Sequence, residues 1–318
     1  MPKARRPARV GALGTVTRSG RQVSLVRGDG SPTSATTDRT SRGAGRDGRL
    51  RARTPPATIV AMTSPHGGRA SIAMYGFAPL QPHLQHLWDL VVRAIPSLPA
   101  TLEWDVDLHA QWRDPSLALS QTCGWPVVTE LADLVASGAV RVLGTFVPTI
   151  AGAEDHTYRS VLVARSPNPG PLAGLHAAVN SMASLSGWVS LVHAVHGPDA
   201  AWQGVVTVTG SHSASMVAVR DGLADVASID AVTYALYGRW FPEVVEGLHV
   251  VGHGPRVPCL PMIAGPAAAS VPTDALRSAL QAAVVDGSSS EARDALLIRD
   301  FAPLDASDYE SLRALAPT

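Results

Sequence analysis

Hydroxyl and small residues at one strand-to-helix junction are the first candidates for chemistry in this 318-residue sequence. The stretch ASLSGW at 183–188 places Ser184, Ser186 and Gly187 between an apolar run and a helical pattern. If a helix begins at Ser186, the N–H groups of Ser186, Gly187 and Trp188 have no intrahelical partner and lie at the positive end of the helix dipole. With the two hydroxyls, they predict a site for a phosphate- or carboxylate-sized anion. The alternative is that a serine only caps the helix.

Two further junctions of this kind follow within about fifty residues. TGSHSAS at 209–215 places His212 in the first turn of the next helix, where an imidazole can donate a hydrogen bond to an anion. ASID at 227–230 ends on Asp230, whose carboxylate suits an amine or a hydroxyl on a ligand. The alternatives are a solvated loop histidine and an N-cap aspartate. Three junctions on successive strand ends favour a shared ligand over three separate caps.

A fourth junction, SQTCGWPVVTEL at 120–131, contains Cys123 and Trp125 before a helix with Pro126 in its first turn. Cys123 is a candidate nucleophile by residue type. No histidine or carboxylate lies close beside it in the sequence to activate the thiol. We therefore interpret Cys123 as a small residue that lines a binding site.

Known catalytic and metal-binding patterns are missing from the sequence. There is no GxGxxG after a strand, no P-loop, no HExxH and no GxSxG. The eleven histidines do not cluster at metal-ligand spacing, and His83 and His86 are expected on the exposed face of a helix. Cys123 and Cys259, the only two cysteines, lie far apart and form no CxxC pair. We expect no metal and no cofactor.

Short β-like runs alternate with helical patterns from residue 69 onward, which predicts parallel sheets covered by helices. We expect strands at 70–77, 101–109, 140–148, 158–165, 176–180, 204–210, 224–230, 248–254 and 259–265. We expect helices at 80–95, 126–138, 186–197, 213–222, 231–240, 273–287 and 305–316, the last two capped by Thr273 and Asp305. About 250 patterned residues suit two lobes, with ligands at the carboxyl ends of strands.

The N-terminal segment differs in composition from the rest of the chain. Residues 1–56 carry thirteen Lys and Arg and three Asp, and the remainder carries thirteen basic and twenty-three acidic residues. Residues 1–61 predict a disordered basic tail rich in Arg, Gly and Ser, with Met62 as an alternative start. A basic arm for nucleic acid and a targeting peptide are alternatives, although no aromatics interleave with the arginines. Neither a secretory h-region nor a run of eighteen apolar residues is present, so we expect no secretory signal and no transmembrane helix.

The junction segments resemble those of one known family. AVNSMASLSGW at 178–188 resembles the N-x-x-x-STSGY segment of phosphate, phosphite and phosphonate-binding proteins of ABC importers. The segment at 209–236 is similar to the same family's G-H-x-x-x-x-AV-x-x-G-x-ADVA-x-x-D pattern, and 158–165 and 257–265 also fit. The resemblance implies an α/β fold of the type II periplasmic-binding-protein class, in which two lobes are joined by two crossover strands. Lobe 1 would span 68–148 plus 250–318 and lobe 2 would span 149–249, with crossovers near 146–149 and 249–254.

The resemblance also implies a set of ligand-binding residues in the cleft between the lobes. Ser184, Ser186 and the backbone around Gly187 would donate to an oxyanion, with His212 as another partner. Leu185 stands where the family has Thr, which removes one hydroxyl donor. The full set that we expect is Tyr75, Cys123, Trp125, Tyr158, Ser184, Leu185, Ser186, Gly187, His212 and Asp230.

The expected function is binding of a small oxyanion, such as a phosphonate, phosphite or phosphate, by a protein that is not an enzyme. The protein would serve an ABC-type importer and its permease, or be a cytoplasmic relative of such a component. The missing signal favours the cytoplasm, and the family implies the periplasm or cell surface as the alternative. An enzyme on the same scaffold, with Cys123 or His212 acting on a small metabolite, is the alternative function. Nucleic acid is not an expected partner.

Overall fold

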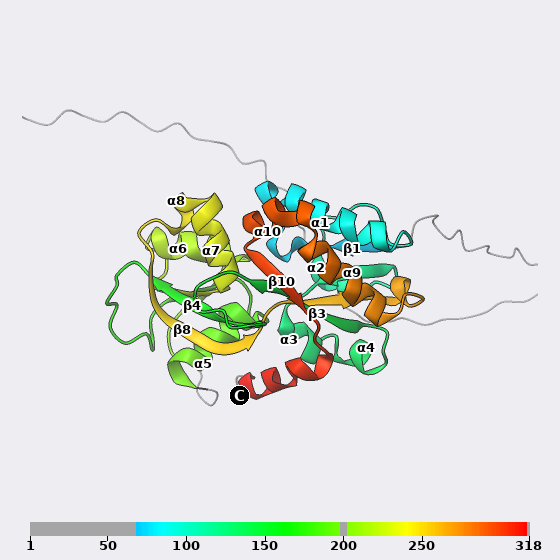
Figure 1. Cartoon of the computed structure of the whole chain (residues 1–318). Coiled ribbons are helices and arrows are strands. Elements are labelled where there is room, and N and C mark those ends of the chain that lie inside the picture. The colour runs from blue at the N-terminus through cyan, green and yellow to red at the C-terminus, as the bar shows by residue number, and fades with distance from the viewer. Residues whose placement is uncertain (1–67, 198–201, 317–318) are drawn as a thin grey trace, which may run out of the picture. The chain divides into compact units, whose positions relative to one another are not determined.

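The computed structural model describes residues 68–197 and 202–316, which all belong to one unit, Ala61–Thr318. These residues form two five-stranded sheets, each with its own helices (Figure 1). The first sheet has the order β1-β2-β9-β3-β10 and the second has the order β6-β5-β7-β4-β8. We call each sheet with its helices a lobe. The expected basic tail at 1–61 lies outside the described residues.

The strands of the first lobe are β1 (Arg69–Ser71), β2 (Leu117–Gln121), β3 (Arg141–Pro148), β9 (Pro261–Ala264) and β10 (Ile298–Ala302). The strands of the second lobe are β4 (Thr157–Ala164), β5 (Ala177–Val179), β6 (Val206–Val208), β7 (Val226–Ile229) and β8 (His249–Pro258). Parallel pairs join β1 to β2, β6 to β5 and β5 to β7. The other pairs are antiparallel, because β9, β10 and β4 run against their neighbours. The expected parallel sheets are therefore mixed sheets.

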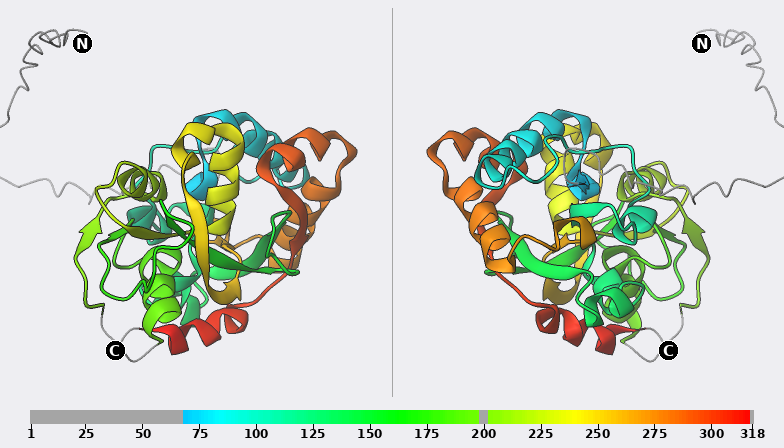
Figure 2. Two further views of the ribbon diagram at one scale, coloured as in Figure 1. Left: turned by 90° about the vertical axis from the view of Figure 1, so that its left-hand side faces the viewer. Right: turned by 90° about the vertical axis from the view of Figure 1, so that its right-hand side faces the viewer.

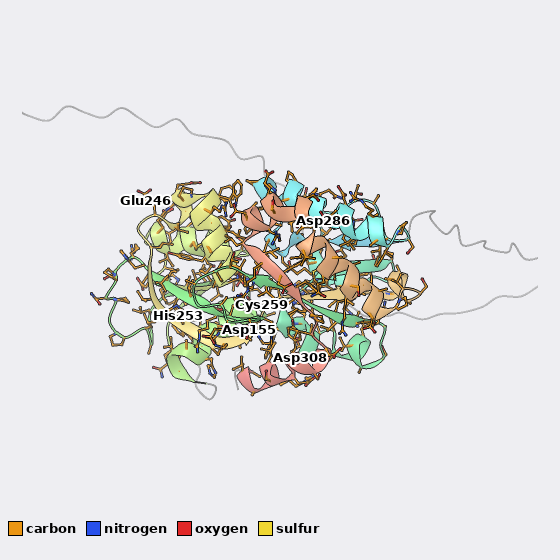
Figure 3. The ribbon with its side chains drawn as sticks, viewed as in Figure 1. Asp155, Glu246, His253, Cys259, Asp286 and Asp308 are labelled. Carbon is orange, nitrogen blue, oxygen red and sulfur yellow. The ribbon has the colours of Figure 1, made fainter. Side chains whose placement is uncertain are left out.

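The chain crosses between the lobes twice. It leaves the first sheet after β3 and returns between β8 and β9, at 258–261. The return lies later than the expected 249–254, because β8 stays paired with β4 as far as Pro258, opposite Thr157. The two crossing segments are tied together, since the Cys259 N–H donates to the His156 carbonyl at 2.8 Å. Figure 3 marks Cys259 near the middle of the fold and Glu246 at its outline.

Three helices of the first lobe pack together beside its sheet. In α1, Leu84, Leu87, Trp88 and Val91 are buried, which is the spacing of one helix face. This helix contacts α9 and α10, and α9 also contacts β3 and β10 (Figure 2). The helical segments are η1 (Ala73–Tyr75), η2 (Ala78–Leu80), α1 (Gln81–Ala94), α2 (Leu108–Trp112), α3 (Gly124–Val128), α4 (Ala132–Ala136), η4 (Pro266–Ala268), α9 (Thr273–Val285), η5 (Gly287–Ser289), α10 (Ser290–Leu296) and η6 (Ala306–Leu315).

The second lobe carries the junctions at which its helices begin. It contains η3 (Leu185–Val189), a π-helical turn that continues into α5 (Ser190–His196). It also contains α6 (His212–Arg220), α7 (Ala231–Trp240) and α8 (Pro242–Val245). α6 packs on β5 and β7, α5 on β8 and α7 on β4. Within residues 68–197 and 202–316, every helix falls short of the length and hydropathy that a membrane span requires.

Most of the expected elements of the second lobe are confirmed, and the errors lie mainly in the first. The strand expected at 101–109 is wrong, because this stretch is irregular and then forms α2, which Asp107 caps through the Ala110 N–H at 3.2 Å. Its alternation has another cause: Leu102 enters the core while Glu103 pairs with Arg69 at 2.7 Å. β2 was missed, because all five of its residues are buried and leave no alternating pattern.

Smaller differences follow from local geometry. The strand expected at 70–77 ends at Ser71, and a 3-10 turn then carries Tyr75. The helix expected at 126–138 is split into α3 and α4, because the backbone leaves the helical region at Thr129. Asp305 caps η6 as expected, although that segment is a 3-10 helix, whereas the Thr273 side chain does not cap α9. α8, α10 and β10 were not foreseen.

Candidate functional site

A cavity of about 260 Å³ lies between the two lobes. It is lined by Tyr75 and Cys123 from the first lobe, and by Ser184, Ser186, His212 and Asp230 from the second. These six belong to the predicted set. The structure thus brings together residues that are up to 155 positions apart in the chain, at the helix starts that the sequence pattern singled out.

The helix behind the Ser-Leu-Ser-Gly segment begins one residue earlier than expected. Ser184 is its N-cap, and the Ser184 Oγ accepts from the Gly187 N–H at 3.0 Å. The Trp188 N–H donates to the Ser184 carbonyl at 3.0 Å. The expectation that the Gly187 and Trp188 N–H groups lack partners is therefore wrong, and the capping alternative applies to Ser184. What this segment offers a ligand is the Ser184 and Ser186 hydroxyls.

Gly187 serves the site by being small. A Cβ at this position would lie 1.9 Å from the Asn180 Oδ1, a distance that real atoms do not tolerate. Asn180 follows β5, and its Oδ1 is buried without a hydrogen-bond partner in the described part of the chain. Gly187 thus leaves room for an amide that lines the cavity. Leu185, by contrast, does not line the cavity and is 1% exposed in the core.

Ser186 and His212 form the central polar pair of the cavity. The Ser186 Oγ lies 2.9 Å from the His212 Nε2. Two further bonds fix the pair: the Ser228 Oγ donates to the Ser186 carbonyl at 2.6 Å, and Ser211 caps α6 through the Ala214 N–H at 3.1 Å. Burial lowers the pKa of His212, and the Asp230 carboxylate opposes this shift. The imidazole is therefore neutral near pH 7 when nothing else acts on it.

Asp230 joins the lobes. Its carboxylate accepts from the Thr233 N–H at 2.7 Å as the N-cap of α7, and the Tyr75 Oη donates to both of its oxygens at 3.2 Å. Burial, with the Asp230 carboxylate as the second cause, raises the pKa of both Tyr75 and Tyr158 well above the ordinary value. Tyr158 is 1% exposed and does not line the cavity. Both phenols therefore stay protonated, and the Tyr75 hydroxyl donates to the carboxylate.

Cys123 and Trp125 lie at the start of α3. Cys123 lines the cavity, and burial raises the pKa of its thiol despite nearby backbone N–H groups. A protonated thiol is a poor nucleophile, so the geometry does not support the enzyme alternative. Trp125 packs against the core and does not line the cavity. Groups of three or more metal-ligating side chains are also missing from the described ranges.

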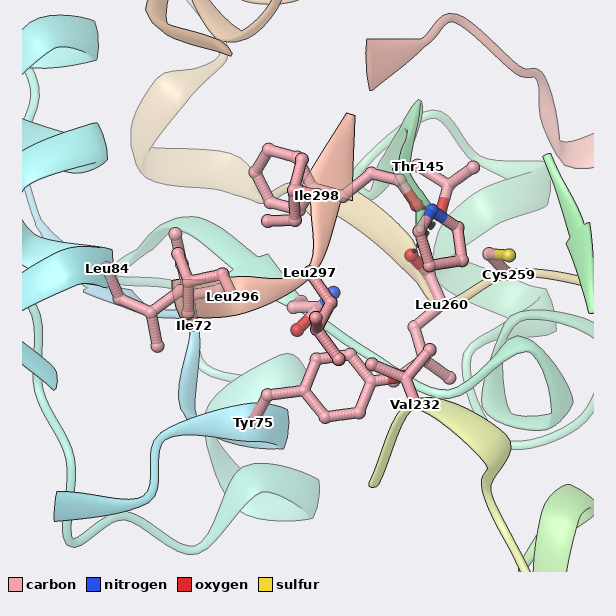
Figure 4. Close-up of a pocket in the computed structure, with 13 residues that line it drawn as sticks. Ile72, Tyr75, Leu84, Thr145, Val232, Cys259, Leu260, Leu296, Leu297 and Ile298 are labelled. Carbon is pink, nitrogen blue, oxygen red and sulfur yellow. Dashed lines mark hydrogen bonds between the residues drawn. The ribbon is translucent and has the colours of Figure 1, made fainter. Parts of the chain in front are cut away.

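A second, smaller cavity of about 20 Å³ lies on the other side of Tyr75. Figure 4 shows Tyr75 below an apolar group that includes Ile72, Leu296 and Ile298. Tyr75 and Leu260 line both cavities. The Tyr75 ring is therefore a partition, with an apolar face on one side and the hydroxyl directed to Asp230.

Sequence reasoning missed several residues of the larger cavity. They are Met74, Leu108, His109, Trp112, Asn180, Ser181, Ala183, Gly210, Thr233 and Leu260. Asn180 had a signal, since it ends an expected strand immediately before the serine segment. Met74 and Leu108 had none, because they lie in stretches that were expected to be strands, and Trp112 lies in α2, which was not expected.

Comparison with known proteins places this geometry in a family. A family model described as the periplasmic substrate-binding protein of a phosphonate ABC transporter matches residues 130–309, more than half of the 318-residue chain. The chain belongs to this family. The predicted family is therefore confirmed, and so is the expectation that the chain is a phosphonate-type substrate-binding protein. The family is periplasmic. A search of curated protein sequences gives no match.

Solved structures support the same fold at low sequence identity. PhnD1 from Prochlorococcus marinus, in complex with methylphosphonate, is 14% identical over 74% of this chain and 92% of its own, with a TM-score of 0.55. A binding protein component of an ABC phosphonate transporter from Pseudomonas aeruginosa is 14% identical over 78% and 85%, with a TM-score of 0.57. A Xanthomonas citri protein bound to ATP is 18% identical over 77% and 94%, with a TM-score of 0.55. These likenesses confirm the type II periplasmic-binding-protein fold.

Proposed function

We propose that this protein binds a small phosphorus oxyanion in the interlobe cavity and delivers it to the permease of an ABC transporter at the periplasmic side. The observation that carries the proposal is the Ser186–His212 pair, 2.9 Å apart at the wall of that cavity. The family supports the ligand class and the transporter partner.

The pair can hold an anion in a specific way. If the imidazole takes up a proton, its Nε2–H donates to the Ser186 Oγ, and the Ser186 O–H is free to donate to the ligand. The His212 Nδ1, which is buried without a partner among the described atoms, then becomes a second donor. The Ser184 hydroxyl accepts from Gly187 and can still donate its own proton.

Histidine and hydroxyl groups would stabilise the negative charge of the ligand. Among the described residues that line the cavity, none is a lysine or an arginine. Hydrogen bonds to a charged group contribute about 1.5–3 kcal/mol each, which is a factor of ten or more in affinity. We therefore assign most of the specificity for an oxyanion to Ser186 and His212.

Calorimetric titration of the full chain tests this proposal. The ligands are phosphite, phosphate and methylphosphonate, with sulfate as the non-phosphorus comparison. Ser186→Ala and His212→Ala should each weaken binding by about tenfold or more. The exposed Ser137→Ala and His249→Ala are matched controls, because both residues lie away from the cavity lining. Absence of binding by every phosphorus anion, or full affinity in both site variants, would contradict the proposal.

A further inference from the structure

The two walls of the interlobe cavity differ in chemistry. The second lobe contributes Asn180, Ser184, Ser186 and His212. The first lobe contributes mainly apolar side chains, with Leu260 from the return crossover; they are Met74, Leu108, Trp112 and Pro126, beside Tyr75, His109 and Cys123. The side chains of Met74 and Leu108 are only partly buried and pack against the core. Partly exposed apolar side chains that face a polar wall indicate a ligand with both a polar and an apolar part.

The only carboxylate that lines the cavity among the described residues is Asp230, and its oxygens already have donors. The Tyr75 hydroxyl reaches both oxygens and the Thr233 N–H reaches one. Asp230 is also only 3% exposed. A ligand ammonium group would therefore have to compete with the Tyr75 hydroxyl for a carboxylate that is almost fully buried, or remain in the cavity without a charged partner. The sequence suggested the Asp230 carboxylate as a partner for a ligand amine. In the structure this carboxylate instead accepts a hydrogen bond that links the two lobes.

We infer that the cavity selects a phosphonate with an uncharged apolar substituent larger than methyl, and that Met74 and Leu108 determine this specificity. The inference rests on the proposed function, because the oxyanion must be held by Ser186 and His212 for its substituent to reach the opposite wall. The chemical class is an alkyl- or arylphosphonate. Inorganic phosphate and aminoalkylphosphonates are disfavoured, the first for lack of apolar contact and the second for lack of a free carboxylate.

The size of the cavity agrees with such a ligand. On the same measure that gives about 260 Å³ here, about 10–15 Å³ is enough for one water. An oxyanion head held by the second lobe leaves room for several further atoms. Each methylene that moves from water to the apolar wall strengthens binding by about fourfold.

A matched ligand pair tests the inference. n-Propylphosphonate and 2-aminoethylphosphonate have the same chain length and differ only in a terminal methyl or ammonium group. Calorimetric titration of the full chain should give an affinity at least tenfold higher for n-propylphosphonate. Methylphosphonate should fall about fifteenfold below n-propylphosphonate, and phosphate should be weaker still.

Variants of the apolar wall separate a specific contact from general hydrophobicity. Met74→Ala and Leu108→Ala should each reduce the gain in affinity from methylphosphonate to n-propylphosphonate. Val285→Ala is the control, because Val285 is an exposed apolar residue on α9 outside the cavity lining.

The outcomes distinguish this inference from the proposed function. If methylphosphonate and phosphate bind through Ser186 but chain length has no effect, or if 2-aminoethylphosphonate binds as tightly as n-propylphosphonate, the inference is overturned and the proposed function stands. If no phosphorus anion binds, both are overturned. A steep gain with chain length that disappears in Met74→Ala and Leu108→Ala supports both.

Discussion

The two lobes contribute to the cavity by different means. The second lobe places its polar side chains at the starts of helices, where Ser184, Ser211 and Asp230 act as N-caps. The first lobe supplies apolar side chains from short turns and crossover segments, such as Met74 in η1 and Leu260 between β8 and β9. Helix capping, which depends on neighbouring residues, thus places the polar side chains of the cavity. The apolar wall instead depends on the packing of segments that lie far apart in the sequence. We expect substitutions of the polar side chains to change affinity, and substitutions in the apolar wall to change selectivity.

The largest expected loss of stability and affinity comes from substitution of Gly187, because its surroundings in the second lobe leave no space for a side chain. Gly187→Ala would place a Cβ 1.9 Å from the Asn180 Oδ1. We expect overpacking to lower the free energy of unfolding by about 1–3 kcal/mol and binding to fall by more than tenfold. Thermal unfolding and titration with methylphosphonate would measure the two effects.

Two further variants identify the cause. Gly187→Ala combined with Asn180→Ala should recover stability without recovering affinity, since the clash is removed together with a cavity amide. Gly238→Ala in α7 has no close contact and should be neutral or stabilise by about 0.5–1 kcal/mol. Full affinity in Gly187→Ala would show that Asn180 and the serine segment are not arranged as described.

A smaller effect is expected at the contact that joins the lobes. Tyr75→Phe removes the hydroxyl that donates to Asp230 at 3.2 Å and keeps the aromatic ring. Because the bond crosses between the lobes, its loss should favour an open arrangement and weaken binding by about tenfold. Small-angle scattering with and without ligand should show a wider empty form than in wild type.

Tyr309→Phe is the matched control for this contact. The Tyr309 Oη donates to the Cys259 carbonyl at 2.9 Å, away from the cavity lining. This variant should lower stability without changing ligand affinity. Equal affinity for ligand in Tyr75→Phe and wild type would contradict a role of Tyr75 in closure.

The smallest effect is a dependence of binding on pH. Burial lowers the pKa of His212 in the empty protein, and a bound anion favours the charged imidazole, so binding should take up a proton. Affinity should therefore rise as pH falls through the region near neutrality, by at most about tenfold per pH unit. Titration in two buffers with different ionisation enthalpies measures this uptake, and His212→Ala subtracts the part that belongs to the ligand.

The stability of the empty protein should change in the opposite direction. Because the pKa of His212 is lower in the folded chain than its unfolded value of about 6.5, the unfolded chain binds more protons below that pH. The contribution of neutral His212 to stability is thus present above pH of about 6.5 and is lost as the pH falls. His212→Ala should flatten this part of the stability curve. No difference in proton uptake between wild type and His212→Ala would exclude His212 as the partner of the anion.

The sequence predicted the second lobe better than the first for a physical reason. Helix caps and strand ends leave local signals, so Ser184, Ser186, His212 and Asp230 could be identified from a few neighbouring residues. The helix after Ser184 begins one residue earlier than the sequence indicated, and this shift changed which backbone N–H groups lack a partner. Met74 and Leu108 lie in η1 and α2, two short helical turns that leave no clear pattern in the sequence, and α2 contacts the fully buried strand β2. The hydrogen bond from the Tyr75 hydroxyl to the Asp230 carboxylate could not be predicted either, because the two residues lie 155 positions apart in the chain.

A crystal structure of the full chain with n-propylphosphonate bound would show which lobe holds the oxyanion and which holds its substituent. We predict phosphonate oxygens within hydrogen-bond distance of the Ser186 Oγ and the His212 imidazole, with the propyl group against Met74 and Leu108. The Tyr75–Asp230 contact should remain intact in that complex. A phosphonate group outside the cavity, or one with its propyl group toward Ser186, would overturn this assignment of the two walls.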